Sequence, residues 1–153
     1  MSHSFERLCE HILPLSKATD FNAAKREWEL AGIELHEEMT HCPCGQEIKE
    51  MCFIRNAITH ATTHVGNVCI QRFIGIDTGN TFAGLRRIAS NLSANANEDL
   101  IIHAHQLGFI YENEYSFLMD TRNKRNLSSK QLHWKEKINR RILSKTVVRS
   151  RLP

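Results

Sequence analysis

The chain of 153 residues is 41% apolar and 24% charged, with a formal net charge of +3, which is typical of a globular domain. No apolar run approaches the ~20 residues that a transmembrane helix needs, which argues against a membrane-spanning protein and a membrane partner. The N-terminal sequence MSHSFERLCEHILPL lacks the basic start, long apolar stretch and cleavage site of a signal peptide, so we expect a cytoplasmic protein.

The small net charge hides a strong asymmetry along the chain. From Thr121 to Pro153 there are eleven Lys or Arg and one acid, Glu136, whereas residues 1–120 hold nine bases and sixteen acids. A basic segment of this kind is common in nucleic-acid-binding proteins. The alternative is a solvated helix whose basic face rests on the acidic body of the same protein.

The N-terminal segment, residues 1–38, is predicted to be helical. Apolar residues recur at helical spacing over residues 4–17. Asp20 is a good N-cap for a second helix, which has Trp28 on its buried face and which Gly32 would end. An extended or loosely helical stretch follows.

Residues 39–76 are predicted to form a zinc-binding module. Four of the five cysteines fall in one short window: Cys42, Cys44, Cys52 and Cys69. In a reducing compartment, clustered cysteines favour a metal over disulfides, and four thiolates suit a structural Zn²⁺ site. Cys9 lies apart, and we interpret it as a small apolar residue in a helix.

The module has the order of elements of a treble-clef-like zinc module. Residues 42–45, with the sequence CPCG, indicate a tight knuckle whose glycine supplies turn freedom. Residues 48–55 and 62–65 are predicted to pair as a β-hairpin. Residues 68–74 should start a short helix, and Cys69 on its first turn could complete the metal site. This position suits a thiolate ligand, because a helix N-terminus lowers the pKa of a thiol.

The fourth ligand remains open between Cys52 and a histidine. Imidazole is as good a zinc ligand as thiolate, and His41, His60 and His64 lie in the same window. If Cys52 faces the core, His60 or His64 would replace it. The alternative to a metal site is a set of small buried cysteines, with Cys52 on a strand and Cys69 on a helix.

The same window resembles a short zinc-finger pattern of poorly characterised proteins from bacteriophages, prophages and large DNA viruses. The similar positions follow the order C-x-C-G, I, N-x-x-T and V-G-x-x-C: Cys42, Cys44, Gly45, Ile48, Ile54, Asn56, Thr59, Val65, Gly66, Asn67, Cys69 and Phe73. A second, weaker similarity covers residues 115–142 and concerns a helical segment found beside such fingers. The resemblance implies a mobile-element protein that contacts nucleic acid, and it carries no defined activity.

Residues 77–153 are predicted to form a C-terminal helical segment. One helix should begin at Thr81, and a capping-box pattern at residues 95–98 should open the next, which Gly108 would end. A further helix is expected over residues 111–120.

The last helix has the clearest start signal, a capping box at residues 128–131. Its apolar stripe includes Trp134, which the helical period places in the core. The basic residues off this stripe are the candidate nucleic-acid ligands: Lys130, Lys137, Arg140, Arg141 and Lys145. Residues 146–153 are expected to be a mobile basic tail.

The sequence argues against an enzyme. Asn56, His60 and His64 bear a loose similarity to HNH-type nucleases, but no Asp-His or His-His pair precedes the asparagine at the usual spacing. The H-x-E and P-C-x-x-C motifs of zinc deaminases are also missing from the sequence.

Taken together, these patterns predict a mostly α-helical protein with a small β-hairpin zinc module, α+β overall. We expect a non-catalytic, zinc-containing nucleic-acid-binding protein of phage or prophage origin. The alternative is a protein-binding inhibitor or adaptor whose acidic first 120 residues dock on a host DNA-handling or defence complex. A lesser alternative is an HNH-like nuclease. The sequence leaves the oligomeric state and the choice between DNA and RNA open.

Overall fold

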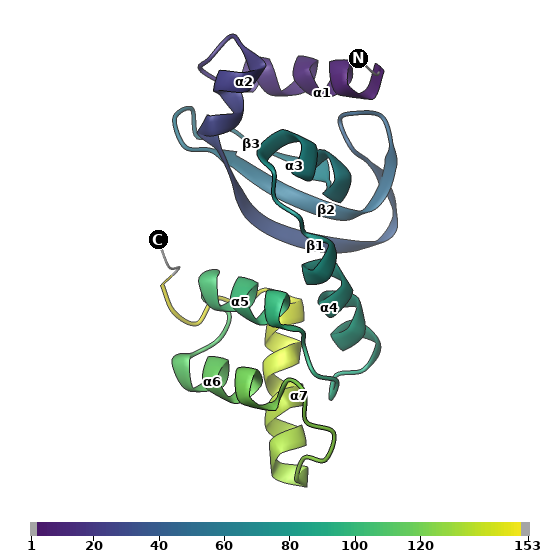
Figure 1. Cartoon of the computed structure of the whole chain (residues 1–153), viewed down its shortest axis with the longest axis vertical. Helices are drawn as coiled ribbons and strands as arrows, with labels where there is room; N and C mark the ends of the chain where they lie inside the picture. Colours follow the sequence, from purple (N-terminus) through teal and green to yellow (C-terminus); the bar gives the residue numbers. More distant parts are fainter. Residues whose placement is uncertain (1–2, 151–153) are drawn as a thin grey trace. The chain divides into compact units, whose positions relative to one another are not determined.

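The structure, a computed structural model, describes residues 3–150 and divides into two compact units, one ending at Thr78 and one beginning at Gly79 (Figure 1). About half of the described residues are helical, and the N-terminal unit adds one three-stranded antiparallel sheet, which confirms the α+β class. Over the described residues, no helix has the length and apolar character needed to cross a bilayer.

The N-terminal unit begins with helix α1 (His3–Ile12), and a 3-10 turn over Leu13–Leu15 follows it. The turn contains Pro14, which lacks the N–H that a continuing α-helix needs. Helix α2 (Phe21–Ala24) starts where expected, because the Asp20 carboxylate accepts a hydrogen bond from the Ala23 N–H at 3.2 Å.

The helix expected to continue to Gly32 is wrong beyond α2. A 3-10 turn runs to Glu27, and strand β1 (Trp28–His41) follows directly. A register shift between Leu30 and Gly32 interrupts the pairing of β1 with β2. Because this irregularity breaks the alternation of buried and exposed side chains, the stretch has no clear period of two in the sequence.

The sheet has the order β1-β2-β3, with β2 spanning Glu47–Asn56 and β3 spanning Thr62–Gly66. The predicted hairpin is confirmed, and its register places Cys52 opposite Val65. Helix α3 (Asn67–Ile74) packs against β2 and β3 (Figure 1).

Aromatic side chains pack the helices of this unit against its sheet. Phe21 of α2 lies 5.2 Å from Phe5 of α1 and 5.2 Å from Phe73 of α3, measured between ring centroids. Trp28 at the start of β1 lies 6.3 Å from Phe73. Burying rings of this size is a main source of stability for so small a core.

The N-x-x-T part of the zinc-finger-like pattern has a structural use. Asn56 is fully buried and its Oδ1 accepts hydrogen bonds from the Ile58 and Thr59 N–H groups at 2.8 and 2.9 Å, while its Nδ2 donates to Glu27 at 2.9 Å. The Thr59 hydroxyl donates to the Leu15 carbonyl at 2.8 Å. These two residues therefore fix the β2–β3 turn against the chain on both sides of α2.

The C-terminal unit is built from helices α4 (Gly79–Ser90), α5 (Glu98–Gln106), α6 (Glu112–Thr121) and α7 (Ser129–Ser144) (Figure 1). Helix α4 begins two residues before Thr81. The N-cap of α5 is Asn97, whose side chain accepts from the Leu100 N–H, and the capping box of Ser128 and Gln131 at α7 is confirmed.

The buried face of α7 differs from the predicted one. Trp134 is half-buried, whereas Lys135 and Asn139 are fully buried beside Ile138 and Ile142. The Asn139 Nδ2 donates to the carbonyls of Leu92 and Ala94 at 2.8 and 3.0 Å. The partners of Asn139 lie between α4 and α5, and those of Lys135 are Asn95 in the same stretch and Thr121 at the end of α6. A hydrophobic period within α7 carries no information about them.

The tail after α7 is anchored over the residues described. The Val148 N–H donates to the Gly108 carbonyl at 2.8 Å, and the Arg149 Nε donates to the Ile110 carbonyl at 2.7 Å. The expectation of a mobile tail is therefore wrong for residues 146–150, and residues 151–153 lie outside the described residues.

Candidate metal centre

Three of the four predicted cysteine ligands meet in the N-terminal unit. Cys42 directly follows β1, Cys44 lies in the turn to β2, and Cys69 is the third residue of α3. Their sulfur atoms lie within 4.8 Å of one another, and all three residues are buried. Sulfur ligands on a tetrahedral zinc ion lie about 3.8 Å apart, given Zn–S bonds of about 2.3 Å, so the cluster can close on a metal with small side-chain movements.

The knuckle that carries Cys42 and Cys44 is held by its own backbone. The Cys42 N–H donates to the Gln46 carbonyl at 2.9 Å, and the Gly45 N–H donates to the Cys42 carbonyl at 2.8 Å. Gly45 has a φ of 100°, a conformation that side chains disfavour. The CPCG sequence thus folds into the tight turn that places two sulfurs on one side.

The surroundings of Cys42 stabilise a thiolate. Its sulfur accepts a hydrogen bond from the Gly66 N–H at 3.3 Å. The Cys69 thiol, together with the N–H groups of Cys44 and Gly66, lowers the pKa of Cys42 to about 5, whereas the same shared proton raises the pKa of Cys69. Metals bind the thiolate form of cysteine, and this arrangement keeps Cys42 as a thiolate at neutral pH.

Cys52, predicted as the fourth ligand, lies outside this cluster. It is fully buried on β2, and its sulfur lies 3.8 Å from the Thr78 hydroxyl. Burial raises the pKa of the Cys52 thiol to about 11, which disfavours the thiolate that a metal needs. Cys52 is therefore a core residue of the sheet.

Two of the three histidines considered as replacements are placed elsewhere. His60 has a φ of 64° in the β2–β3 turn, and its Nδ1 lies 2.6 Å from the Arg55 guanidinium. This turn is at the opposite end of the hairpin from the knuckle. His41 is exposed, with its Nε2 3.9 Å from Glu47.

His64 and His11 lie beside the knuckle. The His64 Nε2 is 2.9 Å from the His41 carbonyl oxygen, and the His11 Nε2 is 2.7 Å from the Thr63 hydroxyl. Burial and the neighbouring His64 lower the pKa of His11, and the Cys42 thiolate opposes this effect. Sequence reasoning missed His11 because it lies on α1, far outside the cysteine window.

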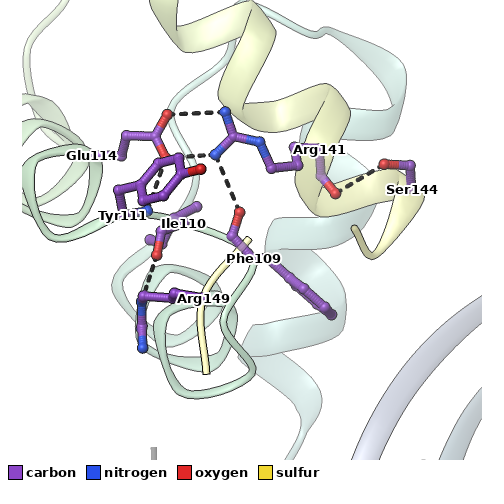
Figure 2. Close-up of polar contacts among 7 residues, drawn as sticks. All are labelled: Phe109, Ile110, Tyr111, Glu114, Arg141, Ser144 and Arg149. Carbon is purple, nitrogen blue, oxygen red and sulfur yellow. Dashed lines mark hydrogen bonds and ion pairs between the residues drawn. The ribbon is translucent and has the colours of Figure 1, made fainter. Parts of the chain in front are cut away.

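The predicted nucleic-acid ligands on α7 fall into two groups. Arg141 is enclosed: its guanidinium contacts both oxygens of Glu114 at 2.5 and 3.1 Å, donates to the Phe109 carbonyl at 3.3 Å, and lies 5.5 Å from the Tyr111 ring centroid (Figure 2). The prediction that Arg141 contacts nucleic acid is therefore wrong, because its guanidinium is not part of the accessible basic surface. Lys145 is exposed at the C-cap of α7, in a left-handed conformation.

Lys130, Lys137 and Arg140 are exposed on one face of α7. Their separations of seven and three residues bring them to the same side of the helix. Within residues 3–150, no ion pair involves any of these three side chains. We call this set the basic face of α7.

Comparison of the chain with protein-family models, curated proteins and solved structures gives no match. The resemblance to a phage zinc-finger pattern therefore stays a prediction. The cysteine cluster and the basic face of α7 are the features from which a function can be argued.

Proposed function

We propose that this protein binds nucleic acid through the basic face of α7, and that a Zn²⁺ ion at Cys42, Cys44 and Cys69 stabilises the N-terminal unit as a scaffold. One observation supports the binding function above others. Lys130, Lys137 and Arg140 are exposed and lack an ion pair among the described residues. Cations presented in this way are available to replace the counterions of a phosphate backbone.

The rest of the C-terminal unit favours the same function. Residues 79–153 hold thirteen Lys or Arg and six acids. Two of these acids are already used: Glu114 pairs with Arg141, and Glu112 lies 2.8 Å from His105. The excess positive charge would attract a polyanion and speed its association at low salt.

Zinc is the metal that we propose because all three clustered ligands are thiolates. Soft sulfur ligands in a closed, buried shell are typical of structural zinc sites. The metal would tie the knuckle to the first turn of α3 across the hairpin, an arrangement similar to treble-clef modules.

The fourth zinc ligand that we propose is a histidine, His64 or His11. The His64 imidazole lies 2.9 Å from the carbonyl oxygen of His41, the residue before Cys42, and the His11 imidazole lies 2.7 Å from the hydroxyl of Thr63, the residue before His64. A ligand from α1 would join the first helix to the sheet, whereas a ligand from β3 would hold the hairpin alone.

The binding proposal can be tested by fluorescence anisotropy with labelled DNA and RNA at several salt concentrations. The test variant carries K130A, K137A and R140A. We expect the wild-type affinity to fall steeply with salt. In a plot of log K against log salt concentration, the negative slope of the variant should be shallower than that of wild type by about 2 to 3.

A matched control removes the same charge from the N-terminal unit. Lys17, Lys49 and Arg72 are exposed there, so K17A/K49A/R72A changes the net charge equally without touching α7. We expect this control to bind like wild type at each salt concentration. Equal losses of affinity in both variants would show that binding depends only on net charge and not on the basic face of α7. If the wild-type protein binds neither DNA nor RNA at low salt, the nucleic-acid-binding function is excluded.

A further inference from the structure

An open groove in the C-terminal unit is lined by two aromatic side chains. Phe117 of α6 and Trp134 of α7 stack with ring centroids 4.2 Å apart and an angle of 19° between the ring planes. Ser128, Lys130 and Gln131 complete the lining. Trp134 is only half-buried, so part of the indole is available to a ligand.

The aromatic pair is held rigidly from within the unit. The Lys135 ammonium lies 5.7 Å from the centroid of the Phe117 ring, a favourable cation–π distance. Lys135 is itself fully buried, and it donates to the Thr121 hydroxyl at 3.1 Å and to the Asn95 side chain. A stack fixed in this way loses little conformational entropy when a flat ligand adds to it.

Cations flank the indole on the exposed side of the helix. Lys130 lies one turn before Trp134, and Lys137 lies about one turn after it, and both belong to the basic face of α7. A flat apolar surface between two ammonium groups has the chemistry to take a nucleobase with its neighbouring phosphates.

We propose that this groove binds an unpaired base of a single-stranded nucleic acid, which stacks on Trp134 while Lys130 and Lys137 contact the adjacent phosphates. The inference rests on the proposed nucleic-acid binding and specifies its substrate. In a duplex both faces of each base are already covered by neighbouring bases, so a stacking site selects single strands.

The test compares three labelled probes by fluorescence anisotropy at low salt: oligo-dT and oligo-rU of about 20 nucleotides, and a DNA duplex of equal length. The variants are W134A and the milder W134F, with L132A as the control. Leu132 is also an exposed apolar residue of α7, but it does not line the groove.

We expect wild type to bind the single strands roughly tenfold more tightly than the duplex, and W134A to lower single-strand affinity roughly tenfold. Binding to the duplex should change less. L132A should match wild type, and W134F should lose less affinity than W134A because it keeps an aromatic face. The two single-strand probes show whether DNA or RNA is preferred.

Tryptophan fluorescence gives a second measurement that does not depend on the stability of W134A. Stacking of a base on Trp134 should quench the emission of the wild-type protein, and this quenching should be absent in W134F, which retains Trp28. Quenching of equal size in both proteins would overturn the inference.

The failures of the two proposals are distinguishable. If K130A/K137A/R140A weakens binding but W134A and W134F bind single strands like wild type, the stacking site is excluded and the basic face stands. A preference for the duplex would also exclude the stacking site alone. If wild type binds none of the probes, both proposals fail.

Discussion

Arg141 and Glu114 form a two-point ion pair inside the C-terminal unit, with Nη1–Oε1 at 2.5 Å and Nη2–Oε2 at 3.1 Å (Figure 2). The Arg141 side chain is 14% exposed and that of Glu114 is 5% exposed. The carboxylate also accepts a hydrogen bond from the Tyr111 N–H at 2.8 Å, the first N–H of the capping box of α6. The pair therefore connects α7 to the start of α6.

Removing one partner should leave a buried charge without compensation. We expect R141A to lower the free energy of unfolding by about 3 kcal/mol in urea denaturation. R140A, which removes an exposed arginine one residue earlier, is the control and should change stability by less than about 0.5 kcal/mol. Equal effects of the two variants would contradict the structural role of Arg141.

Lys135 should make stability depend on pH in the alkaline range. Burial lowers its pKa to about 8, from an ordinary value of 10.5. Below pH 8 both the folded and the unfolded chain hold the proton, so this contribution is constant. Between pH 8 and 10.5 the unfolded chain binds more protons than the folded chain, so the free energy of unfolding rises with pH.

The expected rise due to Lys135 is about 3 kcal/mol across that range. K135M removes the titrating group and keeps a side chain of similar length. The difference in unfolding free energy between wild type and K135M, measured from pH 7 to 10.5, isolates this contribution from other groups that titrate there. A difference that stays constant over the range would show that Lys135 titrates normally.

Metal content should separate the three clustered cysteines from the other two. C42S, C44S and C69S are expected to lose most of the bound zinc and to melt at a lower temperature, because metal affinity contributes to folding stability. C52S and C9S should keep one zinc per chain in elemental analysis. Loss of zinc from a folded C52S protein would show that Cys52 is a zinc ligand after all.

The fourth ligand can be identified by competition with a coloured zinc chelator. We expect one of H11A and H64A to weaken zinc binding by roughly 100-fold or more, and the other to have a small effect. H60A is the control, because His60 contacts Arg55 at the far end of the hairpin. Unchanged zinc affinity in both H11A and H64A would exclude a histidine ligand at these positions.

Gly108 should be sensitive to substitution for two reasons. It has a φ of 81°, and a Cβ built there would collide with the Arg149 carbonyl oxygen. We expect G108A to cost more than about 1 kcal/mol and to release the chain after α7, which limited proteolysis would detect.

Gly75 provides the matched control for G108A. Its φ is 73°, but nothing lies within 4 Å of a Cβ built there. G75A therefore carries the backbone strain without the collision, and it should destabilise less. If the two variants lose the same stability and the tail stays protected from protease, the anchoring of Arg149 contributes nothing.

The interior of the sheet shows where local patterns were insufficient. The sequence of residues 48–55 predicted a strand where β2 lies, but it could not say that Cys52 would face Thr78 in the core. The first residues of β1 were predicted as helix because the alternation is broken at Leu30 and Gly32, whereas the stretch expected to be extended or loosely helical after Gly32 belongs to the strand. The direction of a thiol and the pairing of an irregular strand depend on partners far away in the sequence.

Signals confined to a few consecutive residues determined the knuckle at residues 42–45, the hairpin and the capping box at Ser128, because short-range backbone geometry and hydrogen bonds decide them. Tertiary structure alone placed Cys52 outside the cluster of Cys42, Cys44 and Cys69, buried Lys135 in place of Trp134, and enclosed Arg141 beside Glu114. A buried polar side chain is stable only beside its partner. The partners of Lys135 and Arg141 lie on other segments of the chain, so only the folded arrangement could separate the buried cations from the basic face of α7.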